Sequence, residues 1–223
     1  MTELVLASNN RKKIAELETF FLSASSNIMR VRTLSEIGWT REIAEDGESF
    51  EENSLIKASV PASLGYVGVA DDSGLSVDAL GGAPGVFSAR YSGEGATDAR
   101  NRAKLLKALA DVPEEKRTAR FVCVMTLVLP EDSPCVIPLE WRPDERLTWK
   151  RGIDPARVMS VRGECEGMIT RERRGSGGFG YDPLFYYPPL EATFGELPAE
   201  EKNKISHRAN AMKKLAEEIK KII

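Results

Sequence analysis

The sequence predicts an α/β fold, because short apolar runs typical of strands alternate along the chain with stretches of helical spacing. Residues 4–7 form one such run, and from Lys12 onward apolar residues recur at helical spacing. Residues 119–129 are almost continuously apolar and rich in valine, which predicts a central strand covered on both faces. The chain closes on a predicted helix whose apolar face is formed by Met212, Leu215, Ile219 and Ile222.

Composition and charge narrow the class of protein. The chain has 223 residues, 42% hydrophobic and 29% charged, which predicts one domain over residues 1–223. The formal net charge of −3 gives no reason to expect nucleic acid or a membrane as a partner. Three cysteines without a C-x-x-C pair favour a reducing compartment. Because the first apolar run is too short for a signal peptide and no membrane-spanning run follows, we expect a cytoplasmic protein.

An acidic segment precedes the second predicted helix. Residues 49–52 match the capping-box pattern, in which the Glu52 side chain bonds back to the first residue of the box. We expect Pro61 to end or kink this helix. The capping role makes Glu52 a poorer metal ligand than Glu45, whose place in the loop before the helix leaves it free to turn toward a site. Favourable placement of acid at a helix N-terminus is the alternative explanation for the whole cluster, and it is the default explanation for Glu48 and Glu51.

Two adjacent carboxylates follow the strand predicted over residues 66–70. We expect residues 71–74 to form a tight turn and residues 75–80 a return strand, so that Asp71 and Asp72 lie at a strand end. Neighbouring carboxylates repel each other unless a cation or hydrogen bonds offset them, and such hard oxygen ligands suit Mg²⁺. An Asx-turn in a hairpin is the alternative explanation, and the local residues favour neither.

A polar turn joins the first predicted strand to the first predicted helix. Its backbone N–H groups, hydroxyl, amides and cations at a helix N-terminus would suit an anion. The turn lacks the glycines of a P-loop, so an ordinary capped helix explains it better when it is taken alone. Its residues are Ser8, Asn9, Asn10, Arg11, Lys12 and Lys13.

Two features near the C-terminus suggest contacts with a ligand. Phe179 lies between two glycines, so it can stack on a ring such as a purine, or else plug the loop beneath it. Ser206 suits a helix N-cap and is followed by His207 and Arg208. Cations at this end oppose the helix dipole unless an anionic or carbonyl-like group is near, so we favour a functional role for them. Lys202 either converges on the same point or is a solvated charge.

Residues from about 131 to 162 differ in character from the rest and predict an irregular excursion. Five of the twelve prolines and two of the three tryptophans fall between Pro130 and Pro155. Residues 164–170 are expected to return to the sheet.

Ordered segments along most of the chain resemble the non-canonical purine NTP pyrophosphatase family, to which inosine and xanthosine triphosphate pyrophosphatases belong. Because they extend from residue 8 to residue 208, the resemblance is highly specific. The segments are SNNRKK at 8–13, FEENSLIKA at 50–58, ADDSGL at 70–75, GGAPG at 81–85 with SARY at 88–91, GGFGYDP at 177–183 and ISHR at 205–208.

The resemblance implies a mixed, strongly twisted sheet with flanking helices, forming two lobes around a central substrate cleft. It also implies a homodimer that requires Mg²⁺ and hydrolyses ITP, dITP or XTP to the monophosphate and pyrophosphate, which cleanses the nucleotide pool. Asp72 would be the general base or the metal-bound carboxylate that orients the attacking water, Glu45 a second metal ligand, and Ser73 a substrate contact. The turn from Ser8 to Lys13 and Lys57 would hold the triphosphate. The implied base site consists of Phe179, Gly180, Tyr181 and Asp182, completed by Lys202, His207 and Arg208.

The implied base site also explains selectivity. Hypoxanthine and xanthine carry a 6-keto oxygen, whereas the 6-amino group of adenine would leave a buried donor on Arg208 or Lys202 unpaired. Such a donor costs about 1–3 kcal/mol. Guanine shares the 6-keto group, so its rejection must depend on its 2-amino group.

The sequence departs from the family pattern in two places, and two functions other than the implied one are compatible with the motifs. Ala44 precedes Glu45 where the family often has a second acid, and the 131–162 excursion is longer than the family's usual loop. One alternative is a pyrophosphatase for modified pyrimidine or ordinary nucleotides. The other is a nucleotide-binding regulator without turnover, against which intact Asp72 and Lys13 argue.

Overall fold

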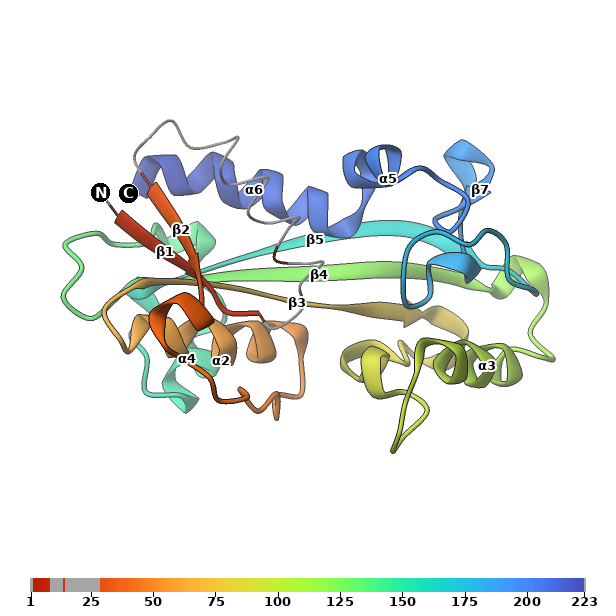
Figure 1. Ribbon diagram of the computed structural model, residues 1–223, viewed down its shortest axis with the longest axis horizontal. Helices are drawn as coiled ribbons and strands as arrows, with labels where there is room; N and C mark the ends of the chain where they lie inside the picture. The colour runs from red at the N-terminus through yellow and green to blue at the C-terminus, as the bar shows by residue number, and fades with distance from the viewer. Residues whose placement is uncertain (1, 9–13, 15–28, 223) are drawn as a thin grey trace. The chain divides into compact units, whose positions relative to one another are not determined.

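The structure is a computed structural model that describes residues 2–8, 14 and 29–222 (Figure 1). Its strands are hydrogen-bonded in the order β2-β1-β3-β4-β5-β6-β7. β1 is parallel to β2 and β3, whereas β6 is antiparallel to β5 and β7, so the predicted mixed sheet is confirmed. The strands are β1 (Thr2–Leu6), β2 (Met29–Thr33), β3 (Val67–Val77), β4 (Thr118–Val128), β5 (Val158–Ile169), β6 (Phe185–Tyr187) and β7 (Ala192–Thr193).

Helices flank this sheet, as predicted for an α/β fold. Most begin where the sequence places a cap: Ser49 Oγ accepts from the Glu52 N–H at 3.1 Å, and Thr97 Oγ1 accepts from the Arg100 N–H at 3.2 Å. Pro61 is the last residue but one of its helix, in agreement with the predicted end. The helices are α2 (Phe50–Ala62), α3 (Asp98–Ala108), α4 (Glu145–Lys150), α5 (Ala199–Ile205) and α6 (His207–Ile222). Within the described ranges, no helix is both long and apolar enough to span a membrane.

The chain folds into two compact units, each of which has its own core. Unit 1 draws its residues from 1–72, 124–162 and 211–223, and unit 2 from 73–123 and 163–210. The boundaries fall inside β3, β4 and β5, so each of these strands contributes to both units. The substrate cleft that the family resemblance implies stays a prediction.

The core of unit 1 lies between α2 and the strands. Leu55 and Ala58 of α2 pack with Val5 of β1 and Val128 of β4, and all four side chains are fully or almost fully buried. Figure 1 shows α2 and α4 on the same side of these strands. Leu147 of α4 packs against this core as well, which anchors the excursion to the unit.

The core of unit 2 is aromatic. The Phe121 ring lies 4.6 Å from the Phe185 ring and 5.9 Å from the Phe194 ring, measured between centroids. Leu105 of α3 and Leu109, directly after that helix, complete this core with no exposed surface. Burial of this apolar area fixes the framework that carries the loop at 175–182.

Residues 71–74 do not form the predicted turn. They lie inside β3, which runs without interruption from Val67 to Val77, and of the four only Ser73 is partly exposed. The D-D-S-G sequence favours a turn locally, but β3 lies between β1 and β4 in the sheet. Backbone pairing and burial therefore override the local preference. The predicted return strand is consequently the end of β3, followed by a short 3-10 helix over Asp78–Leu80.

The excursion is more regular than predicted. It contains α4 and two short 3-10 helices, Leu139–Trp141 and Pro155–Arg157. The chain returns to the sheet at Val158, six residues before the predicted return at 164. Residues 158–162 therefore belong to β5. The helix predicted from Lys12 lies outside the described residues.

Candidate active site

Lys57 is the centre of the candidate site in unit 1. It lies on the inner side of α2, almost fully buried, and its Nζ is 3.2 Å from Asp72 Oδ1 and 3.1 Å from Glu45 Oε1. Burial alone lowers the pKa of Lys57, but the carboxylates of Asp72, Asp71 and Glu45 outweigh it and raise that pKa above its usual value. The Lys57 ammonium therefore contacts two carboxylates and lies near enough to a third to be affected by it, which leaves a surplus of negative charge.

Asn53, one turn before Lys57 on α2, fixes the other oxygen of Asp72. Its Nδ2 donates to Asp72 Oδ2 at 3.2 Å, and its Oδ1 accepts from the Gly47 N–H at 2.9 Å. A Cβ at Gly47 would lie 2.7 Å from Asn53 Oδ1, so only glycine allows this approach. The fully buried amide thus joins the Asp72 carboxylate to the acidic loop before α2.

Glu52 has a different partner from the one that the capping box predicts. Its backbone N–H does donate to Ser49, but its carboxylate accepts from the Glu48 N–H at 3.0 Å and pairs with Lys150 at 2.7 Å and Arg151 at 3.0 Å. The hydrogen bond from Lys150, followed by that from Glu48, lowers the pKa of Glu52 to about 2. A carboxylate already committed to two cations is a poor metal ligand, and the metal-binding role of Glu45 stays a prediction.

The donors near Lys57 are compatible with Mg²⁺. Among the residues that the structure describes, no group of three or more His, Cys, Asp or Glu is arranged to hold a metal ion. Mg²⁺ does not need such a cage, because it is usually bound by one or two carboxylates together with substrate phosphates and water. Asp72 and Glu45 both lie within 3.2 Å of the same ammonium and offer that pair of hard oxygen ligands.

A second buried lysine organises the candidate base site in unit 2. Lys202 Nζ donates to Asp182 Oδ2 at 2.6 Å, and the same oxygen accepts from the Phe179 N–H at 2.7 Å. The ammonium also lies 4.6 Å from the centre of the Phe179 ring and 5.6 Å from that of Phe194. These contacts bring the predicted residues Phe179, Asp182 and Lys202 together.

The loop around Gly180 is held from α3 by two side chains that the sequence did not point to. Asp98 Oδ2 accepts from the Gly180 N–H at 2.7 Å, and Arg102 donates to the Gly180 carbonyl at 2.6 Å. Tyr181 donates its hydroxyl to the Ser88 carbonyl at 2.9 Å, and burial raises the pKa of that phenol. Asp98 directly follows the N-cap of α3, where an acidic residue is common in any helix. Nothing in the sequence therefore connects it with a loop 82 residues away.

His207 and Arg208 lie buried at the start of α6. Ser206 caps this helix as predicted, since its Oγ accepts from the Ala209 N–H at 3.2 Å. The His207 ring stacks on Phe121 with centroids 4.8 Å apart and planes 15° apart. This stacking ties the helix start to the aromatic core of unit 2.

The phosphate-binding prediction is covered only in part. Ser8 follows β1 and is partly buried, whereas Asn9 to Lys13 lie outside the described residues. Ser73 lies on β3 directly after Asp72 and is partly exposed.

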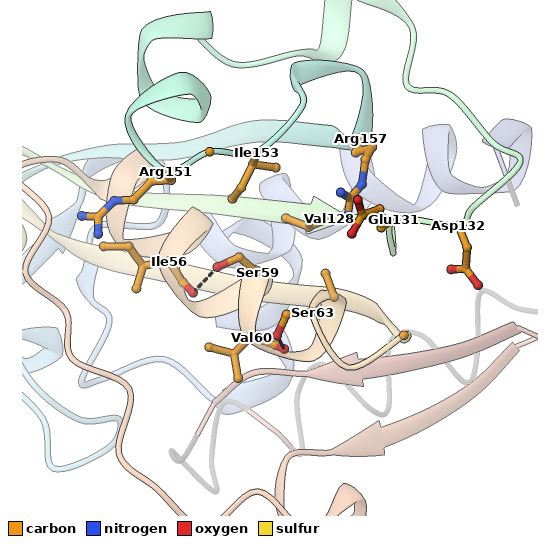
Figure 2. A pocket seen from close by; sticks show the side chains of 13 residues that line it. Ile56, Ser59, Val60, Ser63, Val128, Glu131, Asp132, Arg151, Ile153 and Arg157 are labelled. Carbon is orange, nitrogen blue, oxygen red and sulfur yellow. Dashed lines mark hydrogen bonds between the residues drawn. The ribbon is translucent and has the colours of Figure 1, made fainter.

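A cavity of about 730 Å³ lies in unit 1 between α2 and the excursion (Figure 2). Ile56 and Val60 of α2 face Ile153 and Arg157 across it, and none of the predicted site residues lines it. Arg151, at one end, points its guanidinium away from Arg157 in this view. The cavity is therefore distinct from the Lys57 site.

Comparison with known proteins identifies the family to which the chain is similar. It matches the model of the Ham1 family over residues 4–218. It is 43% identical over 216 residues to a protein of Desulforamulus reducens named dITP/XTP pyrophosphatase, covering 96% of this chain and 94% of that protein. A protein of the same name from Bacillus subtilis is 40% identical over 217 residues, covering 97% and 96%.

Solved structures agree with the sequence comparison. The HAM1 protein from Coxiella burnetii has a TM-score of 0.82 and 38% identity, with 99% of this chain and 100% of that chain covered. The Staphylococcus aureus Ham1 protein has a TM-score of 0.80 and 35% identity, with 99% of each chain covered. The family predicted from the ordered motifs is confirmed, and this chain belongs to the Ham1 family.

Proposed function

We propose that this protein hydrolyses non-canonical purine nucleoside triphosphates, namely dITP, XTP and ITP, to the nucleoside monophosphate and pyrophosphate. The observation that carries the proposal is the Asp72–Lys57 pair in a chain that matches dITP/XTP pyrophosphatases over almost its whole length. The proposed biological effect is removal of these nucleotides from the pool.

Asp72 is the proposed catalytic residue. Lys57 and Asn53 each hold one of its oxygens, so the carboxylate has a fixed orientation before substrate arrives. In this role it orients the attacking water toward the α-phosphorus and takes up its proton. The bond from the α-phosphorus to the bridging oxygen then breaks, and pyrophosphate leaves with the electron pair. General-base catalysis of this kind contributes about 10²–10⁴-fold in rate.

In the proposed complex, the cationic groups of the site bind the phosphates of the substrate directly, and the metal-binding carboxylates act on them through Mg²⁺. Lys57 keeps its charge because its pKa is raised, and it would contact the triphosphate together with Ser73 and the turn over residues 8–13. Asp72 and Glu45 would hold Mg²⁺, which neutralises phosphate charge when it is bound.

The base is the proposed ligand of unit 2. Phe179 would stack on the purine, with Gly180, Tyr181 and Asp182 shaping the loop. An ammonium has three donors, so Lys202 can keep its bond to Asp182 and still donate to a 6-keto oxygen. His207 and Arg208 would complete the selection against adenine, because a 6-amino group cannot accept from these donors.

The assembly and location are further parts of the proposal. Residues 1–223 would act as one pyrophosphatase domain in a cytoplasmic homodimer. Sedimentation velocity of the purified protein tests the dimer, and a single monomeric species at micromolar concentration would contradict it.

A nucleotide panel tests the proposed function. Purified protein is incubated with dITP, ITP, XTP, ATP, GTP and dUTP, with Mg²⁺ or with a chelator, and the products are separated by ion-exchange chromatography. We expect pyrophosphate and the monophosphate from the first three substrates, only with Mg²⁺, and little turnover of ATP. Release of orthophosphate, or equal rates with ATP, would refute the assignment.

A further inference from the structure

At the end of its α-helix, α4, the excursion contacts the acidic loop that carries Glu45 and the first turn of α2. We propose that Lys150 and Arg151, at the end of α4, are positioning residues that hold this loop where Glu45 meets Lys57. The inference rests on the proposed function in one respect, which is the metal-binding role given to Glu45. It assigns a purpose to a segment that the family resemblance leaves unexplained.

Glu52 is the point through which the two cations act. Its Oε1 accepts from Lys150 at 2.7 Å and from Arg151 at 3.0 Å, and its Oε2 accepts from the Glu48 N–H at 3.0 Å. Only 4% of the Glu52 side chain is exposed. A buried carboxylate with both oxygens bound can adopt few other positions, so it transmits the position of α4 to the loop.

Arg151 also holds the loop directly. The same terminal nitrogen that reaches Glu52 lies 3.1 Å from Asp46 Oδ1. Asp46 is the neighbour of Glu45, and the Glu45 side chain is 36% exposed. Three successive residues after Glu45 are thus anchored: Asp46 by Arg151, Gly47 by Asn53, and Glu48 by Glu52.

The excursion is firmly seated, so its cations can act as fixed points. Thr148 of α4 has no exposed surface and donates its hydroxyl to the Glu145 carbonyl at 2.8 Å. Leu147 and Ile153, on either side of the cations, pack against the core of unit 1. Ordering the long side chains of Lys150 and Arg151 costs conformational entropy, and this packing reduces the further cost of ordering their backbone.

The loop itself has no regular secondary structure between residues 41 and 47. Its backbone is therefore held by the side-chain contacts described above rather than by a helix or strand. Loss of the Arg151 contacts would leave Asn53 and a weakened Glu52 as its anchors. The expected consequence is a loop that samples more positions and presents Glu45 to Lys57 for less of the time.

We call the contacts of Lys150 and Arg151 with Glu52 and Asp46 the brace. Hydrogen exchange in the metal-free protein tests the brace without reference to catalysis. The variants are Lys150→Ala and Arg151→Ala. Arg146→Ala is the matched control, because Arg146 lies on the same helix but pairs with Asp144 and is 90% exposed. We expect the Gly47 and Glu48 amides to exchange about tenfold faster in Arg151→Ala, as loss of a hydrogen bond to a charged group implies. Lys150→Ala should give a smaller increase, and Arg146→Ala none.

Activity against Mg²⁺ concentration supplies the second measurement. Arg151→Ala should raise the Mg²⁺ concentration for half-maximal activity about tenfold while kcat at saturating Mg²⁺ stays within about threefold of wild type. The thermal midpoint of each variant is recorded. Lys150→Ala, which removes an exposed side chain, serves if Arg151→Ala does not fold.

The outcomes separate the two proposals. Unchanged exchange at Gly47 and Glu48 in the folded variants would overturn the brace, whatever the enzyme does. Faster exchange with an unchanged Mg²⁺ requirement would overturn the link to Glu45. Absence of pyrophosphate release by wild-type protein would instead overturn the proposed function, and the exchange data would still decide the brace.

Discussion

Each unit contains a buried lysine that is paired with a buried aspartate, Lys57 with Asp72 in unit 1 and Lys202 with Asp182 in unit 2. The remaining neighbours of the two lysines differ. Lys57 Nζ is 3.2 Å from Asp72 and also reaches Glu45, with Asp71 close enough to raise its pKa. Lys202 Nζ is 2.6 Å from Asp182, and its other neighbours are the faces of two phenylalanine rings. The first ammonium lies among excess negative charge, whereas the second is balanced by a single carboxylate.

This difference indicates which ligand each lysine suits. Surplus carboxylates attract a metal ion and through it phosphate, while the charged lysine keeps the site from being purely repulsive to anions. A balanced ion pair beside aromatic faces instead suits a flat, uncharged ring with a carbonyl group. Under the proposed function, the same pair of residue types would therefore support phosphate chemistry in one place and base recognition in the other.

Removing the charge of Asp72 should have the largest effect. Asp72→Asn keeps the shape of the side chain and its contact with Asn53, but it removes the proposed proton acceptor and one charged partner of Lys57. We expect kcat with dITP to fall by about 10²–10⁴-fold. Binding of the monophosphate product, measured by calorimetry, should change far less.

The neighbouring carboxylate is the natural control for this substitution. Asp71 is buried in the same strand, but alternation sends its side chain to the opposite face of the sheet. Asp71→Asn should therefore cost much less in kcat than Asp72→Asn. An equal or larger loss with Asp71→Asn would show that the wrong carboxylate has been assigned to the water.

Breaking the pair in unit 2 should affect stability first. Asp182→Ala leaves Lys202 buried without its carboxylate and removes the acceptor of the Phe179 N–H. We expect the free energy of unfolding, measured with urea, to fall by about 3–5 kcal/mol. In the double variant Asp182→Ala/Lys202→Met, the uncompensated charge is gone, and much of the loss should be recovered. If the double variant is no more stable than the single one, the cost comes from lost loop contacts rather than from the buried charge.

The comparison of the two lysines also shows how far the sequence could lead. Lys57, Asp72 and Phe179 were accessible because each lies in a recognisable segment, whereas Lys202 lies outside those segments and was proposed only from its place a few residues before His207. The turn predicted at Asp71–Gly74 was wrong, since local turn residues carry no information about the strands on either side.

The partners of the site residues were harder to find. Asp98 and Arg102 bond to backbone groups brought close only by the fold, and their own positions look like ordinary helix surface. The brace from Arg151 to Glu52 joins residues 99 apart in the chain. Such contacts depend on packing, which the spacing of residue types does not encode.

Removing the stacking surface should have an intermediate effect. Phe179→Ala deletes the ring beside Lys202, and base–aromatic stacking contributes about 1–3 kcal/mol per base. We expect kcat/KM for dITP to fall by roughly 5- to 150-fold, mainly through KM, with pyrophosphate inhibition unchanged. Phe87→Ala, at an aromatic residue of unit 2 that is 56% exposed, is the control and should have wild-type kinetics. A fall in kcat alone would assign Phe179 to loop packing instead.

Protonation of one carboxylate of unit 1, that of Glu52, should produce the smallest effect. The pKa of Glu52 in the folded protein is about 2, against an ordinary value of 4.5, so its bonds to Lys150 and Glu48 stabilise the fold fully above pH 4.5. That contribution should be lost progressively as the pH falls from about 4.5 to about 2. Amide exchange at Glu48 follows this loss, and Glu52→Gln should flatten its pH dependence over that window. Asp144 also has its pKa lowered to about 2, but it is held by the exposed Arg146, so Asp144→Asn should leave the exchange profile unchanged. If the exchange profile is the same in Glu52→Gln and in the wild type, another carboxylate titrates over this pH range. The cations at the end of α4 then hold the acidic loop of unit 1 less firmly than the distances to Glu52 imply.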